Sequence, residues 1–236
     1  MNNGDGTLLS VRAEARQLVA PDYAVVDGQI EHTARDKVEA VRSVAGSLDR
    51  LTAGLAALGA VPFDEGAGRR PLTWSAYSSA TREELYHDKE TMRMERSGLV
   101  TATVSLRVTV RDLGTLDDLS GVLAAAPGLN VHGVTWHVDW DNPAWPRVRA
   151  AAINAAIGKA RDYAAALGAT LGQVEHIADA GLLGGDAGPF HTVRGVALRA
   201  AGGDQPGTPA LTPVPQELIA TIEARFRATD VSLPSA

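Results

Sequence analysis

Three residues in the second half of the chain have types and a spacing that could form a metal site. His137, Asp139 and Asp141 follow one another at two-residue steps, which places their side chains on one face if the segment is a β-strand. One imidazole and two carboxylates could bind a divalent cation. The same pattern fits the solvated face of an amphipathic strand that leads into a helix cap, because a metal site usually takes ligands from other elements too. The three residues are candidates only, and the sequence assigns no metal and no other cofactor.

Aromatic residues gather in the same stretch. The even-numbered positions of this stretch, which would point to the other face of a strand, are His132, Val134, Trp136, Val138 and Trp140. Trp145 follows five residues later. These side chains could line an aromatic ligand pocket. They could equally fill a hydrophobic core, with each indole N–H finding a partner. The region Trp136–Asp141 is therefore where a small-molecule or metal-binding protein, or an enzyme, would have its site.

The remaining polar motifs have simpler interpretations than catalysis. The glycine-rich run 184–188 lacks the Lys-Ser/Thr pair of a phosphate-binding loop. His191 and Arg194 could act as a general base and an anion clamp, but no partner for them is visible. The acidic pairs 83–84 and 117–118 fit a solvated segment and a helix start. The sequence assigns no catalytic residue, so we expect a protein that is not an enzyme.

The composition narrows the class of protein. The chain has 236 residues, 22 basic and 28 acidic, for a formal net charge of −6, which disfavours non-specific nucleic-acid binding. It contains no cysteine, so disulfides and thiolate chemistry are excluded. It shows neither a signal peptide nor a transmembrane segment, which predicts a cytoplasmic protein if Met1 is the true start.

The strands that must position these residues are predicted from the alternation of apolar and polar side chains. Residues 8–16 alternate between apolar and polar side chains, and a turn at 19–22 connects them to a second extended stretch, 23–32, as a hairpin. Residues 100–111 alternate strictly, with Val, Ala or Leu at even positions and Thr, Ser or Arg at odd positions. One buried and one solvated face is typical of antiparallel sheets. Residues 72–81, 129–140 and 171–179 are also predicted to be extended.

Three helices are predicted between these strands. Their start signals are Thr33 with Asp36 before a helix at 34–58, Thr115 with Asp118 before a shorter helix, and Asn142 with Pro143 before a helix that runs to about Leu167. The first helix has a stripe of large apolar residues, namely Val38, Val41, Ala45, Leu48, Leu51, Leu55 and Leu58. The third has alanines at 152, 156 and 160 on one face, which allow close packing against a neighbour.

Three further segments complete a single domain over residues 1–236. The mixed-charge segment 82–96 is interpreted as a solvated hairpin arm or a mobile loop, or alternatively as a docking arm for another subunit. Residues 181–213 are rich in Gly and Pro and are predicted to be a long loop. Residues 216–228 fit both a strand and a helix by periodicity.

Several local motifs, in this order, resemble the SIMPL-domain family of bacterial proteins. They are Ala20-Pro21-Asp22-Tyr23-Ala24, Leu58-Gly59-Ala60-Val61, Val110-Arg111-Asp112-Leu113, and the alanine-spaced helix from Val148 followed by Gly168 and Leu171-Gly172-Gln173-Val174. The resemblance covers roughly residues 8–180. It implies an α+β fold, with a mostly antiparallel sheet and three main helices packed on it, and a terminal strand at about 216–228. The segment 62–66 departs from the family pattern.

The resemblance also implies what the protein does. The family tends to oligomerise, is associated with the cell envelope and with stress defence, and has no established catalytic residues. Many relatives are exported, whereas this chain shows no signal peptide. We therefore expect a non-enzymatic module that forms a homo-oligomer or binds a protein partner, binds no nucleic acid, and is linked to the stress response. A strictly monomeric protein would contradict this expectation, because an exposed edge strand invites pairing.

Overall fold

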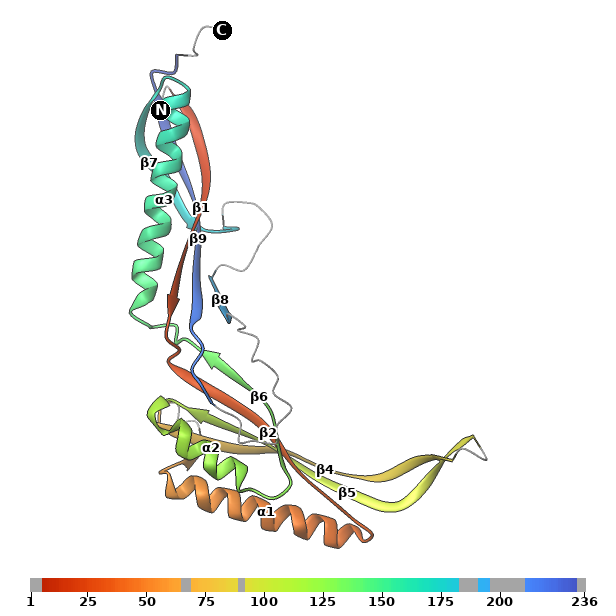
Figure 1. Cartoon of the computed structure of the whole chain (residues 1–236). Helices are drawn as coiled ribbons and strands as arrows, with labels where there is room; N and C mark the ends of the chain where they lie inside the picture. The colour runs from red at the N-terminus through yellow and green to blue at the C-terminus, as the bar shows by residue number, and fades with distance from the viewer. Residues whose placement is uncertain (1–5, 65–68, 89–91, 183–190, 196–210, 233–236) are drawn as a thin grey trace. The chain divides into compact units, whose positions relative to one another are not determined.

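The structure is a computed structural model that describes residues 6–64, 69–88, 92–182, 191–195 and 211–232 (Figure 1). These residues form three α-helices and mostly antiparallel sheets, so the predicted α+β class is confirmed. Where one domain was predicted, the contacts divide the chain into two compact units. Unit 1 comprises Met1–Ala20, Val138–Ala197 and Pro215–Ala236, and unit 2 comprises Pro21–His137 and Leu198–Val214. No helix in the described parts of the chain is long and apolar enough to cross a membrane.

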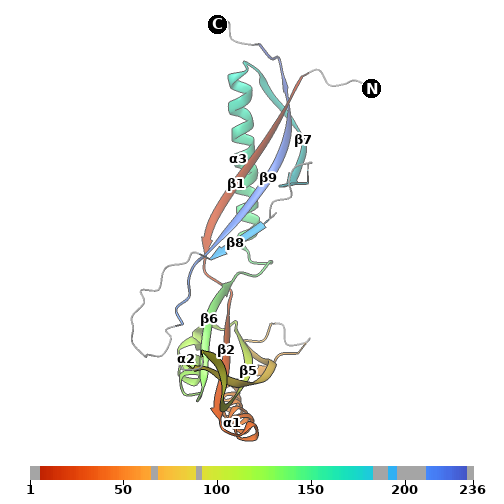
Figure 2. The same cartoon turned by 90° about the vertical axis from the view of Figure 1, so that its right-hand side faces the viewer.

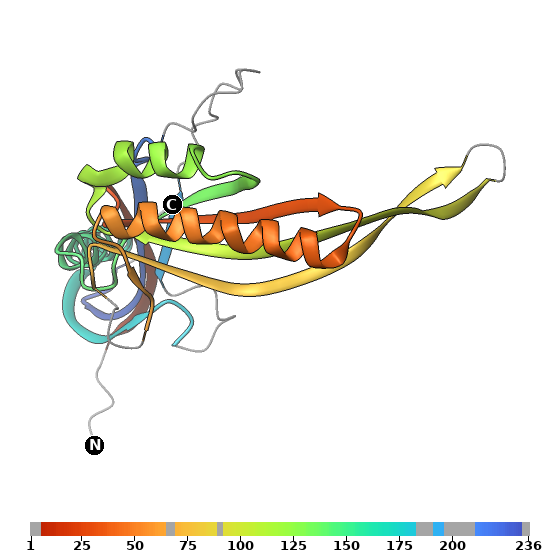
Figure 3. The same ribbon diagram turned by 90° about the horizontal axis from the view of Figure 1, so that it is seen from below.

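Unit 2 is a five-stranded sheet with helices on one face. The strands are β2 (Tyr23–Ala34), β3 (Val61–Pro62), β4 (Leu72–Asp88), β5 (Arg93–Val110) and β6 (Leu129–His137), and the sheet order is β3-β4-β5-β2-β6. All neighbouring strands are antiparallel except the short pair β3–β4. The helices α1 (Lys37–Ala57) and α2 (Leu116–Ala124) cover one face, and the β4–β5 hairpin continues beyond α1 (Figure 3).

The predicted alternation of β5 sets the two faces of this sheet. Leu106, Val108 and Val110 are at most 2% exposed and face the helices, whereas Arg107 between them is exposed. Thr101 is the exception, because it belongs to the polar parity but is fully buried. Its hydroxyl is hydrogen-bonded, which removes the cost of burying it.

The start of α1 differs from the prediction. Asp36 is the N-cap, and its Oδ1 accepts a hydrogen bond from the backbone N–H of Val38 at 3.0 Å. Thr33 does not take part, because it belongs to β2 and pairs with Thr101 of β5. The buried stripe is also rotated from the predicted one, and it consists of Ala40, Val44, Ser47, Leu51 and Leu55. The start of α2 is corrected in the same way: Thr115 makes no side-chain cap, and Asp112 caps the 3-10 turn Leu113–Thr115 before it.

Unit 1 is a four-stranded sheet covered by one long helix (Figure 2). The strand β9 (Gln216–Thr229) lies in the centre of this sheet. It occupies the segment 216–228, for which the family resemblance implied a terminal strand. It pairs with β1 (Thr7–Val19) on one side, and with β7 (Thr170–Asp179) and the short β8 (His191–Gly195) on the other. The helix α3 (Ala144–Ala166) packs against β1, β9 and β7. Ala152, Ala156 and Ala160 of α3 are fully buried in this layer.

The predicted hairpin of residues 8–16 and 23–32 is wrong, because β1 and β2 belong to different sheets. All 13 residues of β1 pair with β9 instead. Pro21 between the strands has no N–H for a ladder, and the N–H of Asp22 donates to the carbonyl oxygen of His137 in β6. The chain therefore leaves one sheet and enters the other at this point.

The predicted loop at 181–213 also needs correction. It contains the strand β8, which pairs with β9. At its other end Leu211 is 6% exposed and belongs to the hydrophobic core of unit 2. Low apolar content predicted a loop here, but a few backbone pairs and one buried leucine suffice to attach the described parts to the two units.

Candidate functional site

The structure does not place the three metal-site candidates on one strand face. β6 ends at His137, the last residue that pairs with β2. Asp139 and Asp141 follow in the turn before α3, where the carbonyl oxygen of Asp139 accepts from the N–H of Asn142. The predicted strand 129–140 is therefore too long, because β6 ends where its partner β2 begins. Among the described residues there is no group of three His, Asp or Glu side chains that could hold a metal ion.

The tryptophans of the same region are likewise separated. Trp136 packs against the core of unit 2, whereas Trp145 is 5% exposed in the core of unit 1. The indole N–H of Trp145 donates to the carbonyl oxygen of Asp139 at 3.0 Å. Trp140 is 81% exposed, and His132 is exposed as well. The core interpretation thus holds for Trp136 and Trp145, which belong to the cores of different units.

The other candidate motifs are placed as follows. The run 184–188 lies outside the described residues. His191 and Arg194 lie in β8, whose side chains are not described. Asp117 and Asp118 lie in the first turn of α2, where negative charge complements the helix dipole.

A two-stranded arm extends from the sheet of unit 2 (Figure 3). We define it as residues 84–88 of β4 and 93–99 of β5, because β2 pairs with β5 as far as Val100, which pairs with Glu83 of β4. It includes most of the charged segment 82–96, of which residues 89–91 lie outside the described part. Four large apolar side chains of the arm are at least 36% exposed, namely Leu85, Tyr86, Met94 and Leu99.

Hydrogen bonds at its base hold the arm to the sheet. Thr101 Oγ1 donates to Glu84 Oε1 at 2.6 Å, and the hydroxyl oxygens of Thr101 and Thr33 are also 2.6 Å apart. Arg82 donates to Glu84 at 3.0 Å and lies 3.8 Å from Glu31 of β2. The pKa of Glu84 is below its ordinary value, because Thr101 and then Arg82 donate hydrogen bonds to the carboxylate. The arm thus begins at a fixed polar junction.

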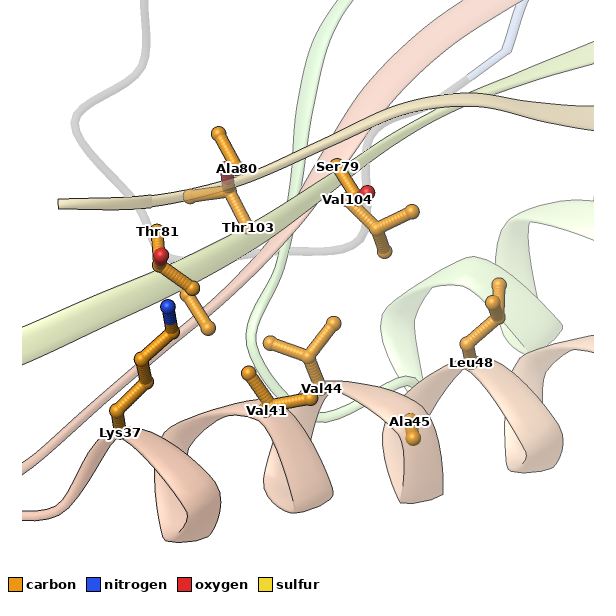
Figure 4. A pocket seen from close by; sticks show the side chains of 11 residues that line it. Lys37, Val41, Val44, Ala45, Leu48, Ser79, Ala80, Thr81, Thr103 and Val104 are labelled. Carbon is orange, nitrogen blue, oxygen red and sulfur yellow. The ribbon is translucent and has the colours of Figure 1, made fainter.

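An apolar groove lies beside the base of the arm, between α1 and the edge of the sheet (Figure 4). It encloses about 400 Å³. Its floor is formed by α1 and its roof by β4 and β5; the lining residues are Lys37, Val41, Val44, Ala45, Leu48, Ser79, Ala80, Thr81, Ala102, Thr103 and Val104. The ammonium group of Lys37 points toward Thr81 at one end (Figure 4).

The groove results from a change of side-chain size along β4. Leu72 and Trp74 face the helices near the start of the strand, since they pair with Val110 and Val108. Ser79 and Thr81 occupy the same face farther along, paired with Val104 and Ala102. α1 packs against β2 and β5, and the small residues of β4 do not fill the space beside it. Val41 in the floor is therefore 45% exposed.

A second, more polar hollow of about 340 Å³ lies on the face of the sheet away from the helices. It is lined by Arg107 and Arg111, among others, and both arginines already have contacts there. Arg107 donates to Asp27 at 2.8 Å, and the guanidinium of Arg111 lies 4.3 Å from the centre of the Tyr23 ring. Tyr23 stacks on His137, at 4.8 Å between ring centres. These contacts fix the side chains of this face to one another.

Sequence reasoning found the arm but missed the groove. The density of mixed charge in 82–96 indicated a solvated hairpin. The groove depends on the pairing of Ser79 with Val104 and on the position of α1, which no local pattern gives. One signal was present: the prediction placed Val41 and Ala45 in the buried stripe of the helix, while the strand 72–81 offered only small residues at its end.

The geometry defines an α+β protein of two units, one of which has an exposed arm and an adjacent apolar groove. The family model for SIMPL, described as a protein of unknown function (DUF541), matches residues 9–226 and thus spans both units. The chain belongs to this family. A search of curated proteins finds no match.

Proposed function

We propose that this protein is a non-enzymatic interaction module that associates with itself through the arm of unit 2. The observation that carries the proposal is the exposure of Leu85, Tyr86 and Met94 on a ribbon of only two strands. An isolated two-stranded hairpin is marginally stable in water, so an arm of this kind gains stability when another surface covers it. Exposed apolar side chains on such a ribbon provide the area for that contact.

The edges of the sheet support the same proposal. β3 pairs with β4 only at Thr73 and Trp74. Beyond Trp74, no strand in the described part of the chain pairs with the outer edge of β4. An open edge exposes backbone donors and acceptors that another strand can use.

Sedimentation velocity on the purified chain at micromolar concentration tests self-association. We expect an oligomer for the natural sequence. A variant in which residues 84–99 are replaced by Asn-Gly closes β4 and β5 with a two-residue turn after the pair Glu83–Val100. We expect this variant to sediment as a monomer and to keep the helical circular dichroism signal of the natural chain, since no helix is altered. A natural chain that is monomeric throughout the range overturns the proposal.

Two finer parts of the proposal concern the cellular role and the location of the protein. We propose a link to stress defence, which a deletion strain grown with and without an oxidant tests by its survival. We also propose a cytoplasmic location, which cell fractionation with an antibody against the chain tests directly. Equal survival of the two strains, or recovery of the chain outside the cytoplasmic fraction, removes the respective part.

A further inference from the structure

The open edge of β4 is uncharged where it borders the groove. Residues 75–81 contain only Ser, Ala, Tyr and Thr, and the charged residues of the strand begin at Arg82. Natural edge strands are usually protected from pairing by charges, prolines or bulges. This stretch has one bulge, near Ala76, and no charge or proline. Ser79, Ala80 and Thr81 of this unprotected stretch also line the groove.

From this coincidence we propose that β4 of a second copy of this chain pairs antiparallel with this edge, with Leu85 of the second copy in the groove. The inference rests on the proposed self-association and names its surface. In β4 the residues Ser79, Thr81, Glu83 and Leu85 have the same parity, and those at 79, 81 and 83 pair with helix-facing residues of β5. The register shift between Glu83 and Leu85 places the extra residues on β5, so the alternation of β4 continues to Leu85. A two-fold axis perpendicular to the joined sheet keeps each residue on its own face. Leu85 of one copy therefore lies over the groove of the other.

The size and polarity of the groove fit this occupant. Leu85 is 52% exposed in its own chain, and Val41 in the groove floor is 45% exposed. Pairing covers both side chains, and their burial is the main favourable contribution expected. Because the roof residues Ser79 and Thr81 are small, a leucine side chain enters without displacing a larger one.

Charge complementarity supports the same arrangement. Lys37 at the end of the groove has no ion-pair partner among the described residues, and its ammonium points toward Thr81 (Figure 4). In an antiparallel pairing that places Leu85 of the second copy opposite Ser79, Glu83 of that copy lies opposite Thr81. Lys37 then meets Glu83 of the second copy. Among the described residues, Glu83 forms an ion pair with the exposed Arg96, at 3.1 Å, a contact that contributes little.

The first experiment compares Leu85→Lys with Tyr86→Lys in sedimentation velocity. Both residues are about half exposed on neighbouring positions of the arm, but Tyr86 lies on the other face. We expect Leu85→Lys to weaken association by about tenfold or more, since it places a charge in the apolar groove. We expect Tyr86→Lys to associate within about threefold of the natural chain. Thermal unfolding of each variant verifies that the fold is kept.

The second experiment exchanges the charges of the inferred ion pair. Lys37→Glu and Glu83→Lys should each weaken association several-fold, and the double variant should restore it, because the pair is reformed with opposite sign. Glu95→Lys is the control, since Glu95 is an acidic arm residue bonded within the arm to Tyr86. It should not rescue Lys37→Glu.

The outcomes separate the inference from the proposal on which it rests. A monomeric natural chain overturns both. If the natural chain associates but Leu85→Lys behaves like Tyr86→Lys, the docking in the groove is wrong and self-association through another surface stands. The same conclusion follows if the double charge exchange fails to restore association. Selective loss with Leu85→Lys, together with rescue by the double variant, supports the inference.

Discussion

The two units solve the packing of a helix on a sheet in different ways. In unit 2, α1 presents Val44, Leu51 and Leu55 to a sheet face that is also built from Val, Leu and Ile. In unit 1, α3 presents alanines to β9, whose helix-facing positions alternate between large and small; they are Leu218, Ala220, Ile222, Ala224, Phe226 and Ala228. A helix with large side chains stands away from its sheet, whereas a helix with alanines can approach it closely.

This difference explains where the groove arises. The space between α1 and the sheet is filled only where both the helix and the strands have large side chains. At Ser79 and Thr81 of β4 the strand has small ones. Under α3 the helix contributes little volume, so the layer does not depend on long side chains from both sides. The unit that relies on large side chains is therefore the one that leaves a hollow when the strand changes to small residues.

The largest effect is expected from shortening a leucine in α1. Leu55 is fully buried, and Leu55→Ala should lower the free energy of unfolding of unit 2 by about 2–5 kcal/mol, because it leaves a cavity in a layer held open by its neighbours. Urea unfolding followed by circular dichroism measures the change. The matched control is Leu18→Ala at a leucine that is 61% exposed, which should alter stability by about 0.5 kcal/mol or less. Equal effects of the two variants would contradict the comparison.

A smaller loss of stability is expected when a side chain in α3 is enlarged instead of shortened. Ala156→Leu adds volume at a fully buried position in a close contact and should cost about 1–3 kcal/mol. Ala155→Leu, at the exposed neighbouring position, is the control and should change stability by about 0.5 kcal/mol or less. The same urea titration serves both variants. Should Ala156→Leu prove as mild as Ala155→Leu, α3 does not depend on close approach.

The faces of strands were predictable from the sequence, but their partners were not. The alternation of 100–110 gave the buried side of β5, with Thr101 as the exception. The alternation of apolar and polar residues indicates which face of a strand is buried, but it does not indicate which strand lies alongside. For this reason the sequence predicted that β1 pairs with β2, whereas it pairs with β9, which is distant in the sequence. The capping residues in the sequence predicted the helix ends to within a few residues. Thr33 was an exception, because it belongs to β2 and pairs with Thr101.

The candidate site shows the same limit. The charge density of 82–96 identified the arm, because solvation is a local property. The three metal-site candidates do not share a strand face, because the length of β6 is set by its partner β2, and the strand ends before Asp139. The groove combines residues of α1 with Ser79 and Val104, which the fold brings together from distant parts of the sequence. Such a surface becomes visible only when the pairing of the strands is known.

The smallest effect is expected at His137, on the face of the unit 2 sheet opposite α1 and α2. Its pKa is below the ordinary value because burial, and then the charge of Arg107, disfavour the imidazolium. The folded protein therefore binds this proton less readily than the unfolded chain does. His137 should lower stability as the pH falls below about 6.5, and it should have no effect on the pH dependence well above that value.

His137→Phe tests this sign, because it keeps a ring against Tyr23 and removes the titration. Urea unfolding of both proteins at about pH 8 measures the exchange of rings alone, and repetition at about pH 5.5 adds the protonation of His137. We expect the natural chain to lose more stability than the variant between the two conditions. A difference between the proteins that stays constant across this range would show that His137 is not the group responsible. The face opposite α1 and α2 would then add no pH dependence to the contrast between the two units, which would rest on the packing under α1 and α3 alone.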